Sequence, residues 1–261
     1  GLTEMDLLQY LHDDKQTDVI LLYLEEVRNG RRLVEVARRI TRGPGAKPIL
    51  AIKSGRTPQG ASAAASHTGS LAGEDAICEA VFREAGIIRV ASIEELFNSA
   101  IMLTYQPLPK GDRLAIVTNA GGPGVMATDA AVRSGLGIAR FAEPTTAKLK
   151  AALPAAANIK NPVDVIGDAR SDRYMAAMEA VLADDGVDQM LVILTPQSMT
   201  DIEDIAEGVR KVHAHATKPI ACSFMGACDV AGGIEMLQAD YIPHYILPEW
   251  ACRAMADVQR V

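Results

Sequence analysis

A histidine surrounded by small residues is the first candidate for chemistry in this chain. Residues 66–73 read SHTGSLAG, so His67 has small and hydroxyl-bearing neighbours and no bulky one. Neutral imidazole is nucleophilic near neutral pH because its unperturbed pKa is about 6.5, so His67 could accept a phosphoryl group without a separate base. Gly69 and Ser70, at the predicted start of a helix, would offer backbone N–H groups to a phosphate. The alternative is an ordinary surface histidine.

Glu25 is the second candidate catalytic residue. It follows a continuous apolar run, residues 19–24, which predicts a strand buried on both faces of a parallel sheet. At the end of that strand its carboxylate could accept a hydrogen bond from one imidazole nitrogen of His67 and orient the other toward a substrate. A carboxylate at the start of a helix is an equal alternative.

The chain around His67 also predicts where the histidine lies. Residues 48–52 form the next predicted strand, followed by Lys53 and by a stretch of Gly, Ser and Ala that ends at Ser66. This stretch is predicted to be a flexible loop at the carboxyl end of the strand, the edge where open α/β sheets bind ligands. Lys53 and Ser66 are therefore candidates for supporting the site.

A glycine-rich turn supplies a second set of candidates. Residues 119–124 read NAGGPG between a predicted strand, residues 113–118, and a helix predicted to begin near residue 125. A helix start of this kind can face a phosphate. The candidate phosphate-binding residues in the turn are Asn119, Gly121, Gly122 and Gly124.

The same turn allows two other interpretations. Residues 122–127 formally satisfy the pattern G-x-G-x-x-A, and Glu143 lies about 20 residues further on, as in dinucleotide-binding folds. However, Pro123 lacks an N–H where a pyrophosphate would need one. A purely structural tight turn is the third possibility.

One further motif, residues 161–164, reads NPVD and ends at Asp164. Asn and Asp make side-chain turns in loops, so a structural role is favoured here. Asp164 is retained as a candidate supporting residue.

Composition excludes several classes of function. The chain has 261 residues, 26 basic against 33 acidic, and only 4% aromatics, which argues against binding nucleic acid. Its four cysteines form no C-x-x-C pair, so no metal site is expected and the thiols are predicted to be buried in a reducing compartment. Without a signal peptide or an apolar run of about 18 residues, a cytoplasmic protein without membrane contact is expected.

Strand and helix patterns alternate along the whole chain, which predicts doubly wound parallel sheets of the α/β class. The stretch 107–112, PLPKGD, has the composition of a linker between domains. Two domains are therefore predicted, residues 1–106 and residues 107–261.

The three motifs together resemble a known family. Residues 66–73, 119–124 and 161–164, in this order and at these separations, resemble the NDP-forming acyl-CoA synthetases, which include the ADP-forming acetate–CoA ligases and succinyl-CoA synthetase. The resemblance implies two flavodoxin-like domains in tandem. It also implies that His67 is a phosphohistidine supported by Glu25, and that residues 122–124 begin a phosphate-facing helix.

The resemblance further implies the reaction and its partners. The complete enzyme interconverts acyl-CoA, phosphate and ADP (or GDP) with a carboxylic acid, CoA and ATP (or GTP), using Mg²⁺. This chain is expected to hold no tightly bound cofactor, to form an oligomer, and to work with an ATP-grasp domain or subunit. The family's CoA-binding Rossmann domain and ATP-grasp domain have no counterpart here, and the first domain is expected to begin late. The alternative function is a non-catalytic regulatory module of the kind fused to some acetyltransferases.

Overall fold

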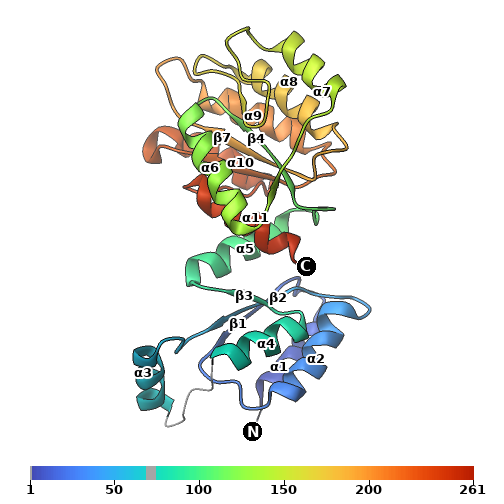
Figure 1. Ribbon diagram of the computed structural model, residues 1–261, viewed down its shortest axis with the longest axis vertical. Helices are drawn as coiled ribbons and strands as arrows, with labels where there is room; N and C mark the ends of the chain where they lie inside the picture. Colours follow the sequence, from blue (N-terminus) through green and yellow to red (C-terminus); the bar gives the residue numbers. More distant parts are fainter. Residues whose placement is uncertain (1, 69–74) are drawn as a thin grey trace. The chain divides into compact units, whose positions relative to one another are not determined.

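The computed structural model describes residues 2–68 and 75–261, except for the side chains of residues 67 and 68. The chain forms two compact α/β units, residues 1–100 with 260–261, and residues 101–259. The units divide inside helix α5 (Ile93–Tyr105), ahead of the predicted linker at residues 107–112. Both units contain parallel sheets, which confirms the predicted fold class (Figure 1).

Unit 1 is built on a three-stranded parallel sheet of strand order β1-β2-β3. Leu21 of β1 pairs with Leu50 of β2, and Leu50 pairs with Ile88 of β3, so all the carboxyl ends lie at one edge. The elements that precede α5 are α1 (Glu4–Asp13), β1 (Ile20–Leu24), α2 (Gly30–Arg42), β2 (Ile49–Lys53), α3 (Pro58–Thr68), α4 (Asp75–Ala85) and β3 (Ile88–Val90).

The prediction that β1 is buried on both faces is wrong. β2 is buried along its whole length, but β1 is an edge strand of the described sheet, its residues are mostly half-buried, and Tyr23 is 57% exposed. An edge strand has a neighbouring strand on one side only, so its residues are less buried, and an apolar run alone cannot reveal this position. One face of the sheet does pack on α1, α2 and α4, with Leu8, Ile40 and Phe82 in the core.

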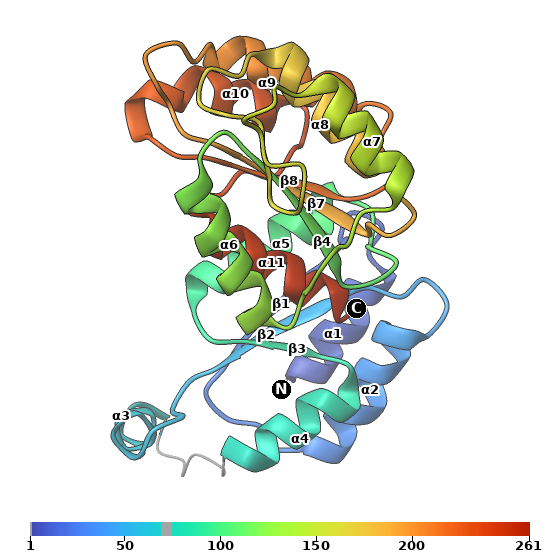
Figure 2. The same ribbon diagram turned by 45° about the horizontal axis from the view of Figure 1, so that its top comes forward.

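The prediction of a loop between residue 54 and Ser66 is also wrong. The chain forms helix α3 from Pro58, and its start is capped because the N–H of Gly60 donates to the Thr57 hydroxyl at 3.1 Å. A threonine cap followed by proline at the first helical position is a common helix start, and the alanines after it favour the helix. In both views α3 stands away from the helices α1, α2 and α4 (Figures 1 and 2).

Unit 2 contains a five-stranded parallel sheet of order β5-β4-β7-β8, in which β6 pairs beside β5 on the same side of β4. Because the chain passes from one side of β4 to the other between β6 and β7, the topological switch point is at β4. The elements are β4 (Arg113–Thr118), α6 (Gly121–Ser134), β5 (Gly137–Ile138), α7 (Glu143–Ala152), β6 (Val163–Asp164), α8 (Ser171–Leu182), β7 (Gln189–Leu194), α9 (Ile202–His213), β8 (Ile220–Phe224), the 3₁₀ turn η1 (Ala227–Val230), α10 (Ala231–Ala239) and α11 (Pro248–Gln259).

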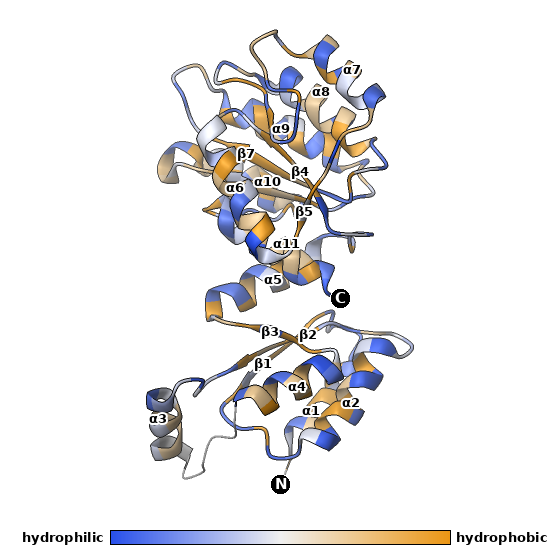
Figure 3. Cartoon of the chain, in the orientation of Figure 1, coloured by the Kyte–Doolittle hydropathy of each residue, from blue (hydrophilic) through white to orange (hydrophobic). Residues whose placement is uncertain are grey.

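The sheet of unit 2 is covered on both faces. Alternate residues of its strands face two separate cores, as the period of two in a strand requires. One core includes Val192 with residues of α8, α9 and α10, and the other includes Leu191 with residues of α6 and α11. Figure 2 shows the helices α7 to α10 on one side of β4 and β7, and α6 with α11 on the other. The apolar colouring of β4 and β7 in Figure 3 agrees with strands that are buried on both faces.

Candidate active site

In unit 1, the carboxyl ends of β1 and β2 are held together next to the histidine-bearing helix. The N–H of Ser54 donates to the carbonyl of Leu24 at 3.0 Å, which places Glu25 near the point where the chain leaves β2. Lys53 is only 1% exposed, and its ammonium group donates to the carbonyl of Ser54. The lysine therefore fixes the backbone ahead of α3, and its role in supporting the site stays a prediction.

His67 lies in the last turn of α3. The backbone of His67 is described, whereas its side chain, and all of Gly69 and Ser70, lie outside the described residues. The hydrogen bond between Glu25 and His67 and the phosphate contacts of residues 69 and 70 therefore stay predictions. The neighbouring Ser66 is exposed, and its hydroxyl donates to the carbonyl of Ala63 at 2.7 Å within the helix.

In unit 2, the glycine-rich turn is the first turn of a helix. α6 begins at Gly121, ahead of the predicted start near residue 125, because proline is tolerated in a first turn and Pro123 does not delay the helix. Ala120 at the cap has no side-chain acceptor, and the N–H groups of Gly121 and Gly122 have no acceptor among the described residues. They carry the positive end of the helix dipole, so this turn can bind an anion.

The glycines of this turn differ in what the fold requires of them. A Cβ on Gly124 would lie 3.1 Å from Thr118 Cγ2 and 3.4 Å from Pro162 Cβ, so this glycine permits close packing of α6 on the sheet. A Cβ on Gly122 would meet no described atom within 4 Å. The fold therefore does not require a glycine at 122, and the space beside this residue is open to another molecule.

Asn119 is buried, and both ends of its amide are hydrogen-bonded within the protein. It is 2% exposed, its amide nitrogen donates to the carbonyl of Thr195 at 2.9 Å, and its amide oxygen accepts from the N–H of Thr195 at 2.8 Å. These bonds join the carboxyl end of β4 to the chain that follows β7. Asn119 therefore positions the start of α6, and the role of its side chain as a phosphate ligand stays a prediction.

The motif at residues 161–164 has a structural role, as predicted for it. Asn161 fills the gap between β5 and β6 along β4: its amide nitrogen donates to the carbonyls of Leu114 and Ala139, and its amide oxygen accepts from Ile116 N–H at 2.9 Å. Asp164 accepts from the N–H of Ile166 at 2.9 Å through Oδ1. Its Oδ2 would lie 3.5 Å from a Cβ on Gly121, so this carboxylate borders the start of α6.

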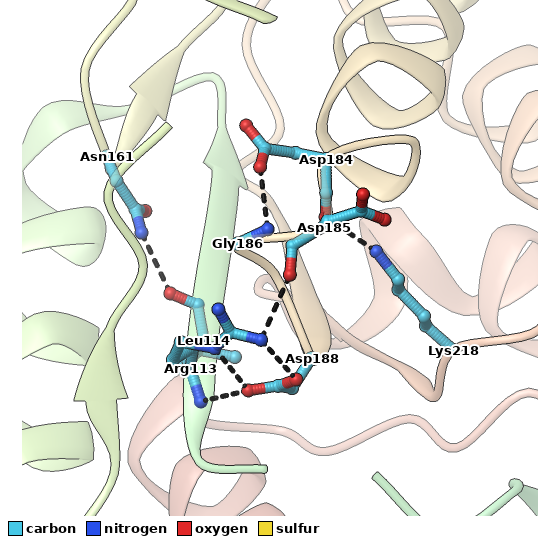
Figure 4. A network of polar contacts seen from close by, with 8 residues as sticks. All are labelled: Arg113, Leu114, Asn161, Asp184, Asp185, Gly186, Asp188 and Lys218. Atoms are coloured by element: carbon cyan, nitrogen blue, oxygen red, sulfur yellow. Dashed lines mark hydrogen bonds and ion pairs between the residues drawn. The ribbon is translucent and has the colours of Figure 1, made fainter. Parts of the chain in front are cut away.

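A network of charged residues lies at the opposite, amino edge of the same sheet (Figure 4). Arg113 donates to both carboxylate oxygens of the buried Asp188, at 2.7 and 2.9 Å, and Lys218 donates to the carbonyl of Asp184 at 2.7 Å. The bond from Arg113 is the main cause of the lowered pKa of Asp188. These groups join the starts of β4, β7 and β8 and lie at the edge away from α6, so we assign them to the fold.

The structure differs from two expectations, one on the dinucleotide pattern and one on the cysteines. Glu143, the acidic residue of the dinucleotide pattern, opens α7 and is exposed, rather than ending a strand as the acidic residue of a dinucleotide fold does. Three cysteines are buried as predicted, but Cys228 is exposed. Among the described residues, no three or more His, Cys, Asp or Glu side chains are grouped as metal ligands, and no helix is long and apolar enough to cross a membrane.

An ionic cluster that joins β3 and α4 to Arg56, ahead of α3, has no signal in the sequence. Arg89 on β3 is 8% exposed and donates to Asp75 and Glu79 on α4, and Arg56 lies 3.9 Å from Asp75. These residues are brought together only by the pairing of β2 with β3 and by the packing of α4. No spacing rule connects them in the sequence.

Known families and proteins match both units. The succinyl-CoA ligase like flavodoxin domain matches residues 1–103, and the Ligase-CoA domain matches residues 114–254. The chain is 42% identical to acetate–CoA ligase [ADP-forming] I of Archaeoglobus fulgidus, over 99% of this chain and 36% of that protein. It is 41% identical to the alpha subunit of acetate–CoA ligase [ADP-forming] II of Pyrococcus furiosus, over 98% of this chain and 56% of the relative.

A solved structure has the same fold. The dinucleotide forming acetyl-coenzyme A synthetase 1 of Ca. Korarchaeum cryptofilum, in complex with phosphate and ADP, superposes with a TM-score of 0.92 at 35% identity, over 99% of this chain and 56% of that chain. The chain thus spans between about a third and somewhat over a half of the length of these relatives. The chain belongs to the NDP-forming acyl-CoA synthetase family, of which it carries the succinyl-CoA-ligase-like flavodoxin domain and the Ligase-CoA domain.

Proposed function

We propose that this chain is the phosphohistidine-bearing part of an ADP-forming ligase that joins a carboxylic acid to CoA. The observation that carries the proposal is the pair of family domains along the chain, with His67 in the last turn of α3, the helix that follows β2. The relatives named above are acetate–CoA ligases, so acetate is the first acid to assay. CoA, ADP and an ATP-grasp partner belong to the proposal for the complete enzyme.

The proposed reaction has two transfers of one phosphoryl group. Phosphate displaces CoA from acyl-CoA and gives an acyl phosphate. A nitrogen of the His67 imidazole attacks its phosphorus, the bond from phosphorus to the carboxylate oxygen breaks, and the acid leaves. An oxygen of the β-phosphate of ADP then attacks the phosphohistidine, the P–N bond breaks, and ATP and free imidazole are formed.

Each supporting residue has a proposed task in these transfers. Glu25 accepts a hydrogen bond from the second imidazole nitrogen and stabilises the ring when it carries the phosphoryl group. The N–H groups of Gly121 and Gly122, which have no acceptor among the described residues, bind phosphate oxygens. Because the carboxylate of Asp164 borders Gly121, the anion approaches from the open side at Gly122.

The proposal is tested by steady-state turnover of the full-length protein with its nucleotide-binding partner. With acetate, CoA and ATP as substrates, His67→Asn is expected to lower kcat by about a thousandfold or more, because removal of a covalent nucleophile removes the reaction path. Gln59→Ala is the matched control, since its side chain is exposed in the first turn of α3, at the end of the helix away from His67. Turnover by His67→Asn at the rate of Gln59→Ala would refute the proposal.

A further inference from the structure

The two ends of the histidine-bearing stretch meet at one ion pair. Arg56 precedes α3 and Asp75 opens α4, and Arg56 Nε lies 3.9 Å from Asp75 Oδ1. Along the chain His67 therefore lies between two residues, Arg56 and Asp75, that contact each other. We call this contact the Arg56–Asp75 neck.

A buried arginine fixes the Asp75 side of the neck. The Arg89 side chain is 6% exposed, and its two terminal nitrogens donate to Asp75 and, at 2.9 Å, to Glu79. The hydrogen bond from Arg89 is the main cause that lowers the pKa of Asp75 below 3.8, although burial opposes it. The charges of Arg56 and Lys53 lower it further. Asp75 is therefore an anion at neutral pH, with cations on both sides.

The two contacts of Asp75 differ in strength. The bond from Arg89 is charge-assisted and comes from a buried guanidinium, and such bonds are among the stronger ones in proteins. The contact with Arg56 is longer, and its side chains are 46% and 36% exposed, so it is screened by solvent and weak. In the neck, Asp75 is thus held firmly by Arg89, whereas its contact with Arg56, ahead of α3, is weak.

We propose that Asp75 is a positioning residue for His67. Asp75 is held by Arg89 of β3 and attracts Arg56, and it thereby fixes the residues that lead into α3, the helix that carries His67. The inference rests on the proposed phosphohistidine role of His67 and adds the residue that fixes the base of its stretch. A role limited to docking α4 on the sheet would make Asp75 and Glu79 equivalent, because both bind Arg89.

The test compares the rate of His67 phosphorylation by ATP, measured by rapid quench in the full-length protein with its nucleotide-binding partner. We expect Asp75→Asn to be about tenfold slower than the wild type, because misplacing a reacting group by a small distance is costly. We expect Arg56→Gln to be about two- to fivefold slower, the scale of an exposed ion pair. The double variant should be no slower than Asp75→Asn, since both changes break one contact.

Two controls lie on the same helix. Glu79→Gln removes the other partner of Arg89 but leaves the neck, and Glu84→Gln removes an exposed ion pair with Arg38 at 3.8 Å. Both should phosphorylate His67 within about twofold of the wild type. Equal slowing by Glu79→Gln and Asp75→Asn, or an unchanged rate in Asp75→Asn, would overturn the inference.

A small phosphoryl donor separates this inference from the proposed function. Phosphoramidate reaches histidine by diffusion, so it should modify His67 equally fast in the wild type and in Asp75→Asn. Slow modification of Asp75→Asn by phosphoramidate would mean altered reactivity of the ring and would overturn a positioning role. If the wild type itself forms no phosphohistidine with ATP, the proposed function fails instead. Arg56 is largely exposed, so Arg56→Gln keeps the comparison valid if Asp75→Asn unfolds.

Discussion

Replacing Asn119 by alanine tests how the start of α6 is held in place. The change removes the two hydrogen bonds with the backbone of Thr195, at 2.9 and 2.8 Å, and a third from the Thr195 hydroxyl at 3.2 Å. A net value of about 1 kcal/mol for each bond gives a loss of about 2–3 kcal/mol in the free energy of unfolding. For a unit of this size that loss lowers Tm by about 4–12 °C.

The assay follows the single tryptophan, Trp250, which packs on the core of unit 2. Its fluorescence during thermal and urea unfolding of the whole chain reports this unit selectively. Two variants serve as controls. Thr195→Ala removes only the hydroxyl contact and keeps the backbone bonds, and Asn158→Ala removes an exposed amide that bonds to Pro162 and Lys160. Each control should cost less than about 1 kcal/mol.

Unfolding of Asn119→Ala at the wild-type temperature would refute the reasoning, because the amide would then contribute nothing to the fold. So would a loss no larger than that of Asn158→Ala. A loss of the expected size would mean that the bonds between Asn119 and Thr195 hold the start of α6 in place.

Two further predictions concern unit 2. Gly122→Ala should leave the free energy of unfolding unchanged or raise it by up to about 1 kcal/mol, since a Cβ here meets open space in a helix, but it should slow phosphoryl transfer to or from His67. Gly124→Ala should lower the free energy of unfolding by about 1–3 kcal/mol, because its Cβ would lie 3.1 Å from Thr118. Urea unfolding that finds Gly122→Ala less stable than Gly124→Ala would contradict this geometry. Burial lowers the pKa of His213 and of His244 below 6.5. The free energy of unfolding should therefore be highest above pH 6.5 and should fall as the pH decreases below it, because the unfolded chain binds protons at a higher pH than the folded one. A midpoint of unfolding, followed by Trp250 fluorescence, that stays constant from pH 8 to 5 would contradict this.

The geometry of the two histidines supports the sign of this pH dependence. The Nε2 atom of His213 lies 2.9 Å from the amide nitrogen of Gln106, and the Nε2 atom of His244 lies 3.0 Å from the backbone nitrogen of Phe224. The amide donor of Gln106 requires an unprotonated nitrogen on His213. The Nε2 atom of His244 also lies 3.2 Å from the carbonyl of Phe224, a contact that raises the pKa of His244, but burial is the larger effect and lowers it. The carboxylate of Asp188 does not obscure the effect, because the bond from Arg113 holds its pKa below 3.8, outside the range from pH 8 to 5.

The parts of the fold that the sequence predicts well are those in which a local pattern and the tertiary environment agree. Residues 113–118 are a predicted strand with the observed bounds, because they lie in a sheet covered on both faces. The run at residues 19–24 has the same pattern but lies at an edge, and no local pattern encodes its neighbours. The helix α3 was predictable from Thr57 and Pro58, a signal that the abundance of small residues obscured.

The candidate site divides in the same way. The positions of Glu25 and of residues 119–124 at carboxyl ends of strands follow from the order of the elements along the chain. Two other features do not follow from this order, because they depend on strand pairing and helix packing between distant segments. They are the hydrogen bonds of Asn119 with Thr195 and the cluster of Arg56, Asp75 and Arg89. Side-chain contacts of this kind have no short-range signal.

The most direct test of the central claim is to locate the phosphoryl group during turnover. Labelled ATP is mixed with the full-length protein and its nucleotide-binding partner, the reaction is quenched in base within milliseconds, and the labelled peptide is sequenced by mass spectrometry. The account predicts an acid-labile, base-stable phosphoryl group on His67 that forms at least as fast as kcat and returns to ATP when ADP is added. Label on another residue, or turnover without label on His67, would contradict it.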